Sequence, residues 1–390
     1  MRLVLAAVIA LPAAATAQTI WNVTTPDIQS VVNQASPGDV LVLTPPTLYR
    51  GFTLSKGLTI RGSDANIGAS PGGTTSDYSI VIAVPPGQVA HLERIDTSYA
   101  YAPWGTVGCR VKVTSGSVRF EDCTLRSDYA LQITNAQVVV TGGSVIGWAT
   151  PNTGTFAIEA TNSHLSLRNC LVTGNVSSCS YPTCQTLLPA RTAIKAIDSV
   201  LHAEGVTVQG GSQSSVPSPG APAVDLQNSA AYFTDCSLTG GSGTVGATAL
   251  VNNGAPAELR NTMLTGGSPG GQASIGLVVV NNSLTRLDIA PAWQRGVTST
   301  MTISGEPSAP FYLFLTPATA SSTIPLAVEP VWDTGAVGLV FGVLDPQGLA
   351  VLGLPVPNDP ALQHATAWFQ VVSGASFPLR ASTIAGGVVR

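Results

Sequence analysis

The chain has 390 residues, of which 10% are charged and 44% are hydrophobic, and its formal net charge is -4. This hydrophobic content excludes a largely disordered chain, and the absence of a lysine or arginine cluster argues against a nucleic-acid partner. With 40 glycines and 28 prolines, the composition is typical of many short strands joined by tight turns.

The first 17 residues have the pattern of a secretory signal peptide. Arg2 supplies a positive charge, residues 3–15 are apolar, and Ala15-Thr16-Ala17 matches a small-residue cleavage site. The apolar run is shorter than the ~20 residues that a membrane span needs, and no later stretch predicts a membrane helix. We therefore expect a protein that is secreted or held at the cell surface, with a mature chain that begins at Gln18.

A short amphipathic helix is predicted next. Thr25 can cap it, Pro26 suits its first turn, and Asp27 suits the positive end of its dipole. Its apolar face would consist of Ile28, Val31, Val32 and Ala35. A turn and a strand over residues 40–43 follow.

From residue 110 onward the sequence repeats a pattern of strands and corners. The unit is clearest over residues 157–174, where alternating apolar and polar positions are broken by Asn162-Ser163 and Asn169-Cys170. Asn, Asp and Gly tolerate the left-handed backbone of a tight corner. One unit cannot bury its apolar side alone, whereas a stack of units can. The sequence therefore predicts an all-β solenoid.

The segment that precedes the repeats carries a resemblance to a known family. Asp27-Ile-Gln, Ala35-Ser-Pro-Gly-Asp-Val, Tyr49-Arg-Gly and Lys56-Gly-Leu-Thr-Ile-Arg-Gly62 are similar to the entry segment of right-handed parallel β-helices of the pectin-lyase-like superfamily. The resemblance implies a right-handed parallel β-helix over residues 18–296, with the helix covering its first rung. It also implies that the repeated corners form a ladder of asparagine-like side chains.

Residues 297–390 follow a different pattern, because short alternating segments are separated by Pro and Gly turns. This pattern predicts a small antiparallel β-sandwich. Asp345-Pro-Gln-Gly348, Leu354-Pro-Val-Pro357 and Phe369-Gln370 resemble a C-terminal β-rich module of secreted planctomycete-type bacterial proteins. The resemblance implies no particular activity for this module.

One column of side chains is predicted to point outward from the first strand of successive repeats. Its members are Lys112, Gln132, Glu159, Lys195, Asp225, Val251 and Val278. The extra residues of the longer repeats nearly all follow the third strand, so the insertions would project along one edge of the solenoid. Such an edge often marks a working face.

Two interpretations of this column remain open. Opposite charges on adjacent rungs stabilise a sheet by ~0.2–1 kcal/mol per pair, and a structural ladder is the simpler interpretation. The family resemblance implies a substrate groove over the same sheet, as in polysaccharide lyases. Lys195 would then act as the base, with Glu159 and Asp225 as calcium or charge partners and Lys112 and Gln132 as binding residues. The acidic residue clusters of pectate lyases and polygalacturonases are missing from the sequence.

The six cysteines fall into three groups. Cys123, Cys170 and Cys236 share one corner of the repeat but lie two rungs apart, about 10 Å, which exceeds the reach of a disulfide. We predict that they are buried free thiols. Cys179 and Cys184 share one polar loop and are predicted to form a disulfide in an oxidising compartment, and Cys109 is predicted to be unpaired.

An ion pair and three aromatic residues are further candidates. Arg168 and Glu204 are neighbours on adjacent rungs, and we expect a solvated ion pair. Trp104, Trp148 and Tyr181 could stack on sugars or cover the edge of the core.

Three functional hypotheses follow. The first is a non-catalytic extracellular or cell-surface protein that binds polysaccharide and needs no cofactor. The second is a calcium-assisted lyase that acts on acidic polysaccharide through Lys195. The third is a structural protein of the cell envelope, docked through residues 297–390. Sequence alone leaves both enzymatic activity and oligomeric state open.

The signal-peptide assignment predicts the N-terminus of the exported protein. Intact-mass measurement and N-terminal sequencing of protein recovered outside the producing cell should give a chain that begins at Gln18, because Ala15 and Ala17 are the small residues that a signal peptidase recognises. An exported chain that still contains Arg2 would contradict the assignment.

Overall fold

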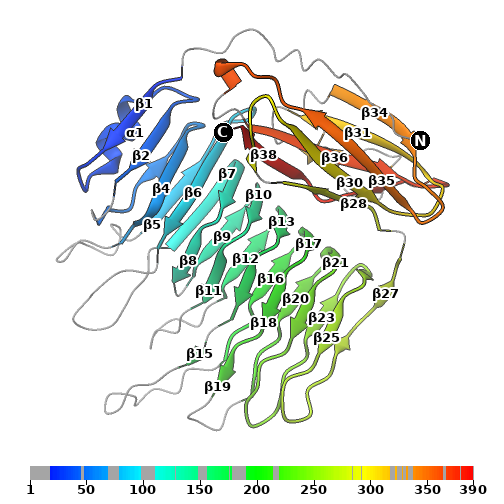
Figure 1. The fold of residues 1–390 in the computed structure, drawn as a ribbon. Helices are drawn as coiled ribbons and strands as arrows, with labels where there is room; N and C mark the ends of the chain where they lie inside the picture. The colour runs from blue at the N-terminus through cyan, green and yellow to red at the C-terminus, as the bar shows by residue number, and fades with distance from the viewer. Residues whose placement is uncertain are drawn as a thin grey trace, which may run out of the picture. The chain divides into compact units, whose positions relative to one another are not determined.

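A computed structural model represents the chain (Figure 1). It describes residues 18–44, 48–68, 79–97, 110–127, 129–147, 156–174, 176–177, 190–213, 219–282, 284–290, 292–316, 321–322, 327, 331–332, 337–362, 366–377 and 379–389. The packing of the chain defines two compact units that meet after Val280.

The first unit is a long parallel sheet of 25 strands that winds round an axis and repeats three faces in order. Strands of the first face are β3 (Thr53–Leu54), β5 (Ser79–Ala83), β9 (Leu131–Thr134), β12 (Ile158–Thr161), β16 (Ile194–Ile197), β20 (Val224–Gln227), β23 (Leu250–Asn253) and β26 (Ser274–Ile275). Strands of the second face are β1 (Ile20–Val23), β2 (Val40–Leu43), β4 (Thr59–Asn66), β6 (Val89–Asp96), β10 (Ala136–Thr141), β13 (His164–Arg168), β17 (Val200–Glu204), β21 (Ala230–Thr234), β24 (Ala257–Arg260) and β27 (Val278–Val280). The long strand β7 (Arg110–Glu121) runs from the first face into the second.

The third face is built from shorter strands. They are β8 (Thr124–Ser127), β11 (Ser144–Gly147), β14 (Leu171–Thr173), β18 (Thr207–Gln209), β22 (Ser237–Thr239) and β25 (Met263–Thr265). A small extra pair, β15 (Val176–Ser177) with β19 (Ser212–Gln213), extends the stacking beyond this face. All of these pairings are parallel, so the predicted parallel solenoid is confirmed.

Left-handed residues form the corners of the coil. At the corner between the second and third faces, Asp122, Asn169, Asp235 and Asn261 all have φ between 45° and 53°. Gly142 and Gly205 occupy the same corner on the intervening rungs, with φ of 67° and 62°. Only Gly adopts this conformation without steric cost, and Asn and Asp adopt it at the lowest cost among the other residues. The prediction of Asn, Asp and Gly corners is confirmed.

Corner residues also bond to their neighbours along the solenoid axis. Asn228 Nδ2 donates to Asp198 Oδ1 at 2.6 Å, and Asn261 Nδ2 donates to Asp235 Oδ1 at 2.7 Å. Beneath them, the buried Ser199 amide donates to the Ser229 hydroxyl at 3.0 Å. These bonds repeat from rung to rung, so the mixed ladder predicted from the corner pattern is present.

The axis of the solenoid is filled by small and branched apolar side chains. Helix α1 (Ile28–Gln34) adds Ile28 and Val32 to one end of this core, where both are buried. Asp27 caps the helix by accepting from the Gln29 amide at 3.1 Å. The expected cap, Thr25, was wrong, because the helix begins two residues later than its Thr-Pro signal indicates. No helix in the described ranges is long and apolar enough to cross a bilayer.

The corner thiols are buried and unpaired. Cys123, Cys170 and Cys236 are free, and burial raises the pKa of each thiol to about 12. The prediction that they fill the core is therefore confirmed. Cys109, Cys179 and Cys184 lie outside the described residues, so the Cys179–Cys184 disulfide and the unpaired state of Cys109 remain predictions.

The last rung differs from its predicted form. The predicted outward column includes Val278, which would place this residue on the first face. Instead Ile275 pairs with Val251 on the first face, and Val278 pairs with Ala257 on the second. Gly276, with φ of 91°, turns the chain between these two strands. The assignment of Val278 to the column was wrong.

Glycines line the necks of the insertions after the third face. Hydrogen bonds there alternate between outgoing and returning segments: Ala221 N donates to Gly211 O at 3.0 Å, and Gly241 N donates to Ala221 O at 2.8 Å. The next step repeats the pattern, because Ala247 N donates to Gly241 O at 2.9 Å. A Cβ atom at Gly241 would overlap the carbonyl of Gly211, so these close approaches require glycine.

The second unit contains small sheets that are antiparallel except where β29 pairs with β38. One sheet is β28 (Arg286–Ile289), β30 (Thr298–Ser304) and β35 (Leu349–Pro355). The other is β29 (Ala292–Trp293), β38 (Ala385–Val389), β36 (Thr366–Ser373), β31 (Pro310–Thr316) and β34 (Val337–Val343), with β37 (Arg380–Ala381) beside β36. A short pair, β32 (Ser321–Ser322) and β33 (Val331–Trp332), and a 3-10 helix (Pro360–Leu362) complete the unit. Met301 and Ile303 of the first sheet share a buried cluster with Phe369 and Val371 of the second.

The corner geometry predicts a difference between two substitutions of Asn228. Asn228→Ala should lower the free energy of unfolding by ~1–2 kcal/mol more than Asn228→Gly, because a β-carbon strains a backbone with φ of 49°. Both variants lose the same hydrogen bond to Asp198, so their difference isolates the backbone. Equilibrium denaturation of the two variants measures it, and equal stabilities would contradict the proposed role of the corner.

Candidate functional site

The predicted outward column lies on the first face in the expected register. Lys112 pairs with Gln132, Gln132 with Glu159, Glu159 with Lys195, and Lys195 with Asp225. Because the strands are parallel and in register, side chains at equal positions stand about 4.8 Å apart along the axis. All five are partly exposed, whereas the residues between them, such as Val113 and Ile158, are buried in the core.

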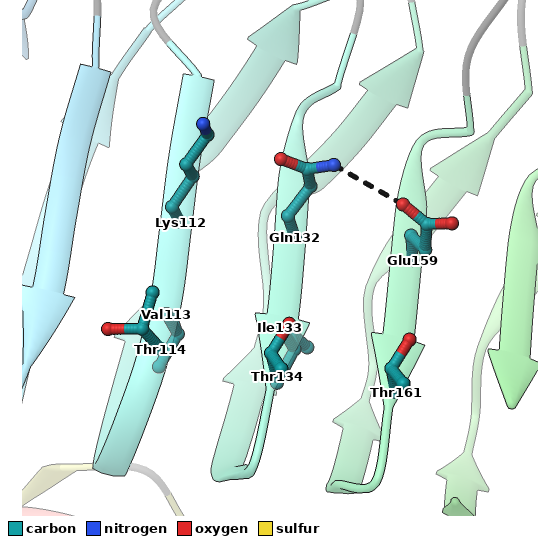
Figure 2. Close-up of a pocket in the computed structure, with 8 residues that line it drawn as sticks. All are labelled: Lys112, Val113, Thr114, Gln132, Ile133, Thr134, Glu159 and Thr161. Atoms are coloured by element: carbon teal, nitrogen blue, oxygen red, sulfur yellow. Dashed lines mark hydrogen bonds between the residues drawn. The ribbon is translucent and has the colours of Figure 1, made fainter. Parts of the chain in front are cut away.

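A shallow depression occupies one end of this column. Its polar side chains form two rows across three strands, with Lys112, Gln132 and Glu159 in one row and Thr114, Thr134 and Thr161 in the other (Figure 2). The depression has an empty volume of about 350 Å³, part of which is open solvent. The threonine row was missed in the sequence, although each threonine follows its partner by two residues and must share its face.

The upper row carries complementary hydrogen-bonding groups. Gln132 Nε2 donates to Glu159 Oε2 at 3.2 Å, and this bond runs between neighbouring strands (Figure 2). Lys112 has three donors, Glu159 has acceptors, and the amide of Gln132 has both. The threonine hydroxyls below both donate and accept. The surface therefore offers donors and acceptors at regular intervals, with a positive charge at one end and a negative charge at the other.

Lys195 and Asp225 do not join this group. The Lys195 ammonium lies 4.9 Å from the centre of the Phe156 ring, which is within the range of a cation–π interaction. The Asp225 carboxylate accepts from Gln227 Nε2 at 3.1 Å. The ion pairs expected between Lys195 and its two acidic neighbours are not among the salt bridges of the described residues. Phe156 and Gln227 were not foreseen as partners.

The three residues of the lyase hypothesis do not all line the depression. The hypothesis needs Lys195, Glu159 and Asp225 to converge on one ligand, but the depression includes only Glu159 of the three. Calcium prefers six to eight oxygen ligands. Among the residues that the structure describes, no group of three or more His, Cys, Asp or Glu side chains is placed to hold a metal ion.

Several charged side chains of the second face are buried. Arg168 Nη2 lies 3.2 Å from Glu204 Oε1, with the two side chains 5% and 2% exposed. The expectation of a solvated ion pair was therefore wrong. Strand alternation distinguishes inward from outward positions, but it does not reveal that an outward position is also covered.

A second charged group lies on the same face. Glu121 Oε2 lies 2.9 Å from Arg119 Nη2 and 3.1 Å from His91 Nε2, and all three side chains are buried. Burial lowers the pKa of His91, although the Glu121 carboxylate opposes this effect. Burial also lowers the pKa of His202 to about 3, so this imidazole is neutral at pH 7 and packs edge-on against Tyr232. None of these groups lines the depression on the first face.

The remaining candidates lie outside the described residues. They are the aromatic residues Trp104, Trp148 and Tyr181 and the predicted Cys179–Cys184 pair.

The fold and the surface together define a parallel β-solenoid protein with an open polar depression on one face. No protein-family model matches the chain, and no curated protein matches its sequence. Among solved structures, it is similar to the enzymatically active domain of bacteriophage CBA120 tailspike protein 2, with a TM-score of 0.37 and 10% identity over 94% of this chain and 71% of that one. A likeness this distant identifies neither residues nor activity.

The contact between Lys195 and Phe156 predicts that calcium does not elicit lyase activity. Incubation with polygalacturonate or alginate and calcium should give no unsaturated uronate product, because Lys195 lies outside the depression that contains Glu159. Product formed by the wild-type protein and abolished in Lys195→Ala would restore the lyase hypothesis.

Proposed function

We propose that this protein is exported and binds polysaccharide without cleaving it, through the depression formed by Lys112, Gln132 and Glu159. The observation that carries the proposal is the double row of polar side chains on an open, rigid sheet face. Each strand pairs with a strand on both sides, which restricts its side chains before a ligand binds. Binding therefore loses little side-chain conformational entropy.

The chemistry of the depression matches hydroxyl-rich ligands. Lys112 and Glu159 stand two rungs apart, about 10 Å, which is close to the length of two linked hexose units. Lys112 donates hydrogen bonds at one end of the row and Glu159 accepts them at the other, while the amide of Gln132 between them can do both. All three side chains can therefore bind hydroxyl groups. The opposite charges of Lys112 and Glu159 favour a neutral or weakly charged chain over a polyanion.

We also propose a more specific fold for each unit and export of the protein from the cell. We infer a right-handed β-helix of the pectin-lyase-like kind, followed by a C-terminal β-sandwich. The buried cluster that unites the two antiparallel sheets supports the sandwich, and the corner ladder supports the β-helix. Export rests on the signal-peptide pattern of residues 1–17.

Binding to a panel of polysaccharides tests the proposal. Affinity electrophoresis against xylan, β-glucan, alginate and polygalacturonate should show retardation by at least one neutral polymer. Lys112→Ala combined with Glu159→Gln should weaken that binding at least ~10-fold, because hydrogen bonds to charged groups contribute ~1.5–3 kcal/mol each.

Asp225→Asn is the matched control, since Asp225 belongs to the same column but lies outside the depression. It should change the affinity less than ~2-fold. Absence of binding to every polymer would contradict the proposed function. Equal losses in the control and the double variant would move the binding site away from the depression.

A further inference from the structure

The β34 strand is an unusual edge in the second unit. It is the last strand of its sheet in the described ranges and pairs with β31 alone. Its sequence, Val-Gly-Leu-Val-Phe-Gly-Val, contains no charge and no proline, which are two of the devices that natural edge strands use to prevent pairing. A register shift lies between Gly338 and Val340, so residues 340–344 form the regular part of this edge. The Phe341 and Val343 side chains are 66% and 60% exposed.

Main-chain groups at this edge point away from the sheet. Leu344 N donates to Ala309 O at 2.9 Å, so residues 344, 342 and 340 direct their amide and carbonyl groups toward β31, in keeping with antiparallel alternation. Phe341 and Val343 therefore direct theirs toward the free side. Phe341 and Val343 thus present two main-chain donors and two main-chain acceptors, and their side chains are also exposed.

We propose that β34 is a self-association edge, where two copies of this chain pair as antiparallel strands around a two-fold axis at Gly342. In this register Phe341 of each copy faces Val343 of the other, and four main-chain hydrogen bonds join the two sheets. An aromatic residue opposite a β-branched residue is a favourable cross-strand pair. The pairing extends one sheet continuously through both copies.

A second copy fits this edge for two reasons. The residues around Gly342 are nearly symmetric, with Val340 and Phe341 before it and Val343 and Leu344 after it, so reversal of the strand places apolar residues opposite apolar residues. Val340 and Leu344 face the core of their own sheet, which leaves the paired surface to Phe341 and Val343. A strand with no charge offers nothing that would select a different partner by electrostatics.

The self-association proposal does not rest on the proposed polysaccharide binding, because β34 and the depression are built from different strands. Sedimentation velocity of residues 18–390 over a range of concentrations should show a monomer–dimer equilibrium. Phe341→Lys should weaken the dimer at least 10-fold, because an edge lysine opposes strand pairing. Val351→Lys is the matched control, since Val351 of β35 is also 66% exposed, and it should leave the dimer intact.

A cross-linking experiment tests the register directly. Residues that face each other in a hydrogen-bonded antiparallel pair have Cα atoms about 5.5 Å apart, a distance that a disulfide spans. The double variant Phe341→Cys/Val343→Cys should form a covalent dimer under mild oxidation, whereas each single variant should not.

Three results would overturn the proposal. The first is a wild-type protein that stays monomeric at every concentration, which would leave the edge to a strand of another protein. The second is a dimer that Val351→Lys disrupts as strongly as Phe341→Lys. The third is a covalent dimer that either single cysteine variant forms as readily as the double variant.

Discussion

The stacking of one rung on the next through main-chain hydrogen bonds is the constraint on which the first unit depends. It holds only if every turn of the coil closes at the same place, and the left-handed corners ensure this. At one corner Asp122, Gly142, Asn169, Gly205 and Asp235 each donate a backbone amide to the next rung at 2.9–3.0 Å. A residue that resisted this backbone would shift the register of both rungs that it joins, and with it every inward side chain.

This register also creates the candidate site. A single lysine, glutamine or glutamate on a strand has no special chemistry, but stacking converts residues far apart in the sequence into rows at fixed intervals. Lys112, Gln132 and Glu159 become neighbours because their strands pair in parallel. The site thus needs no specialised loop, and its spacing is set by the backbone rather than by the side chains.

Much of the solenoid could be predicted from the sequence because its signals are local. Alternation identified the strands, and Asn, Asp and Gly identified the corners. The same logic predicted the outward column from Lys112 to Asp225. It failed at Val278, where the glycine at 276 moved the chain to another face, and at Arg168 and Glu204, whose burial is not encoded by alternation. The partners of Lys195 and Asp225 depend on rotamers, which periodicity does not encode.

The glycine necks have a consequence for how this coil can change over time. Outgoing and returning segments of adjacent insertions meet at Gly211, Ala221, Gly241 and Ala247 through backbone hydrogen bonds. Because these bonds use main-chain atoms, an insertion can change in sequence while its neck still closes. Insertions along this edge of the solenoid can therefore vary in sequence while the core is retained.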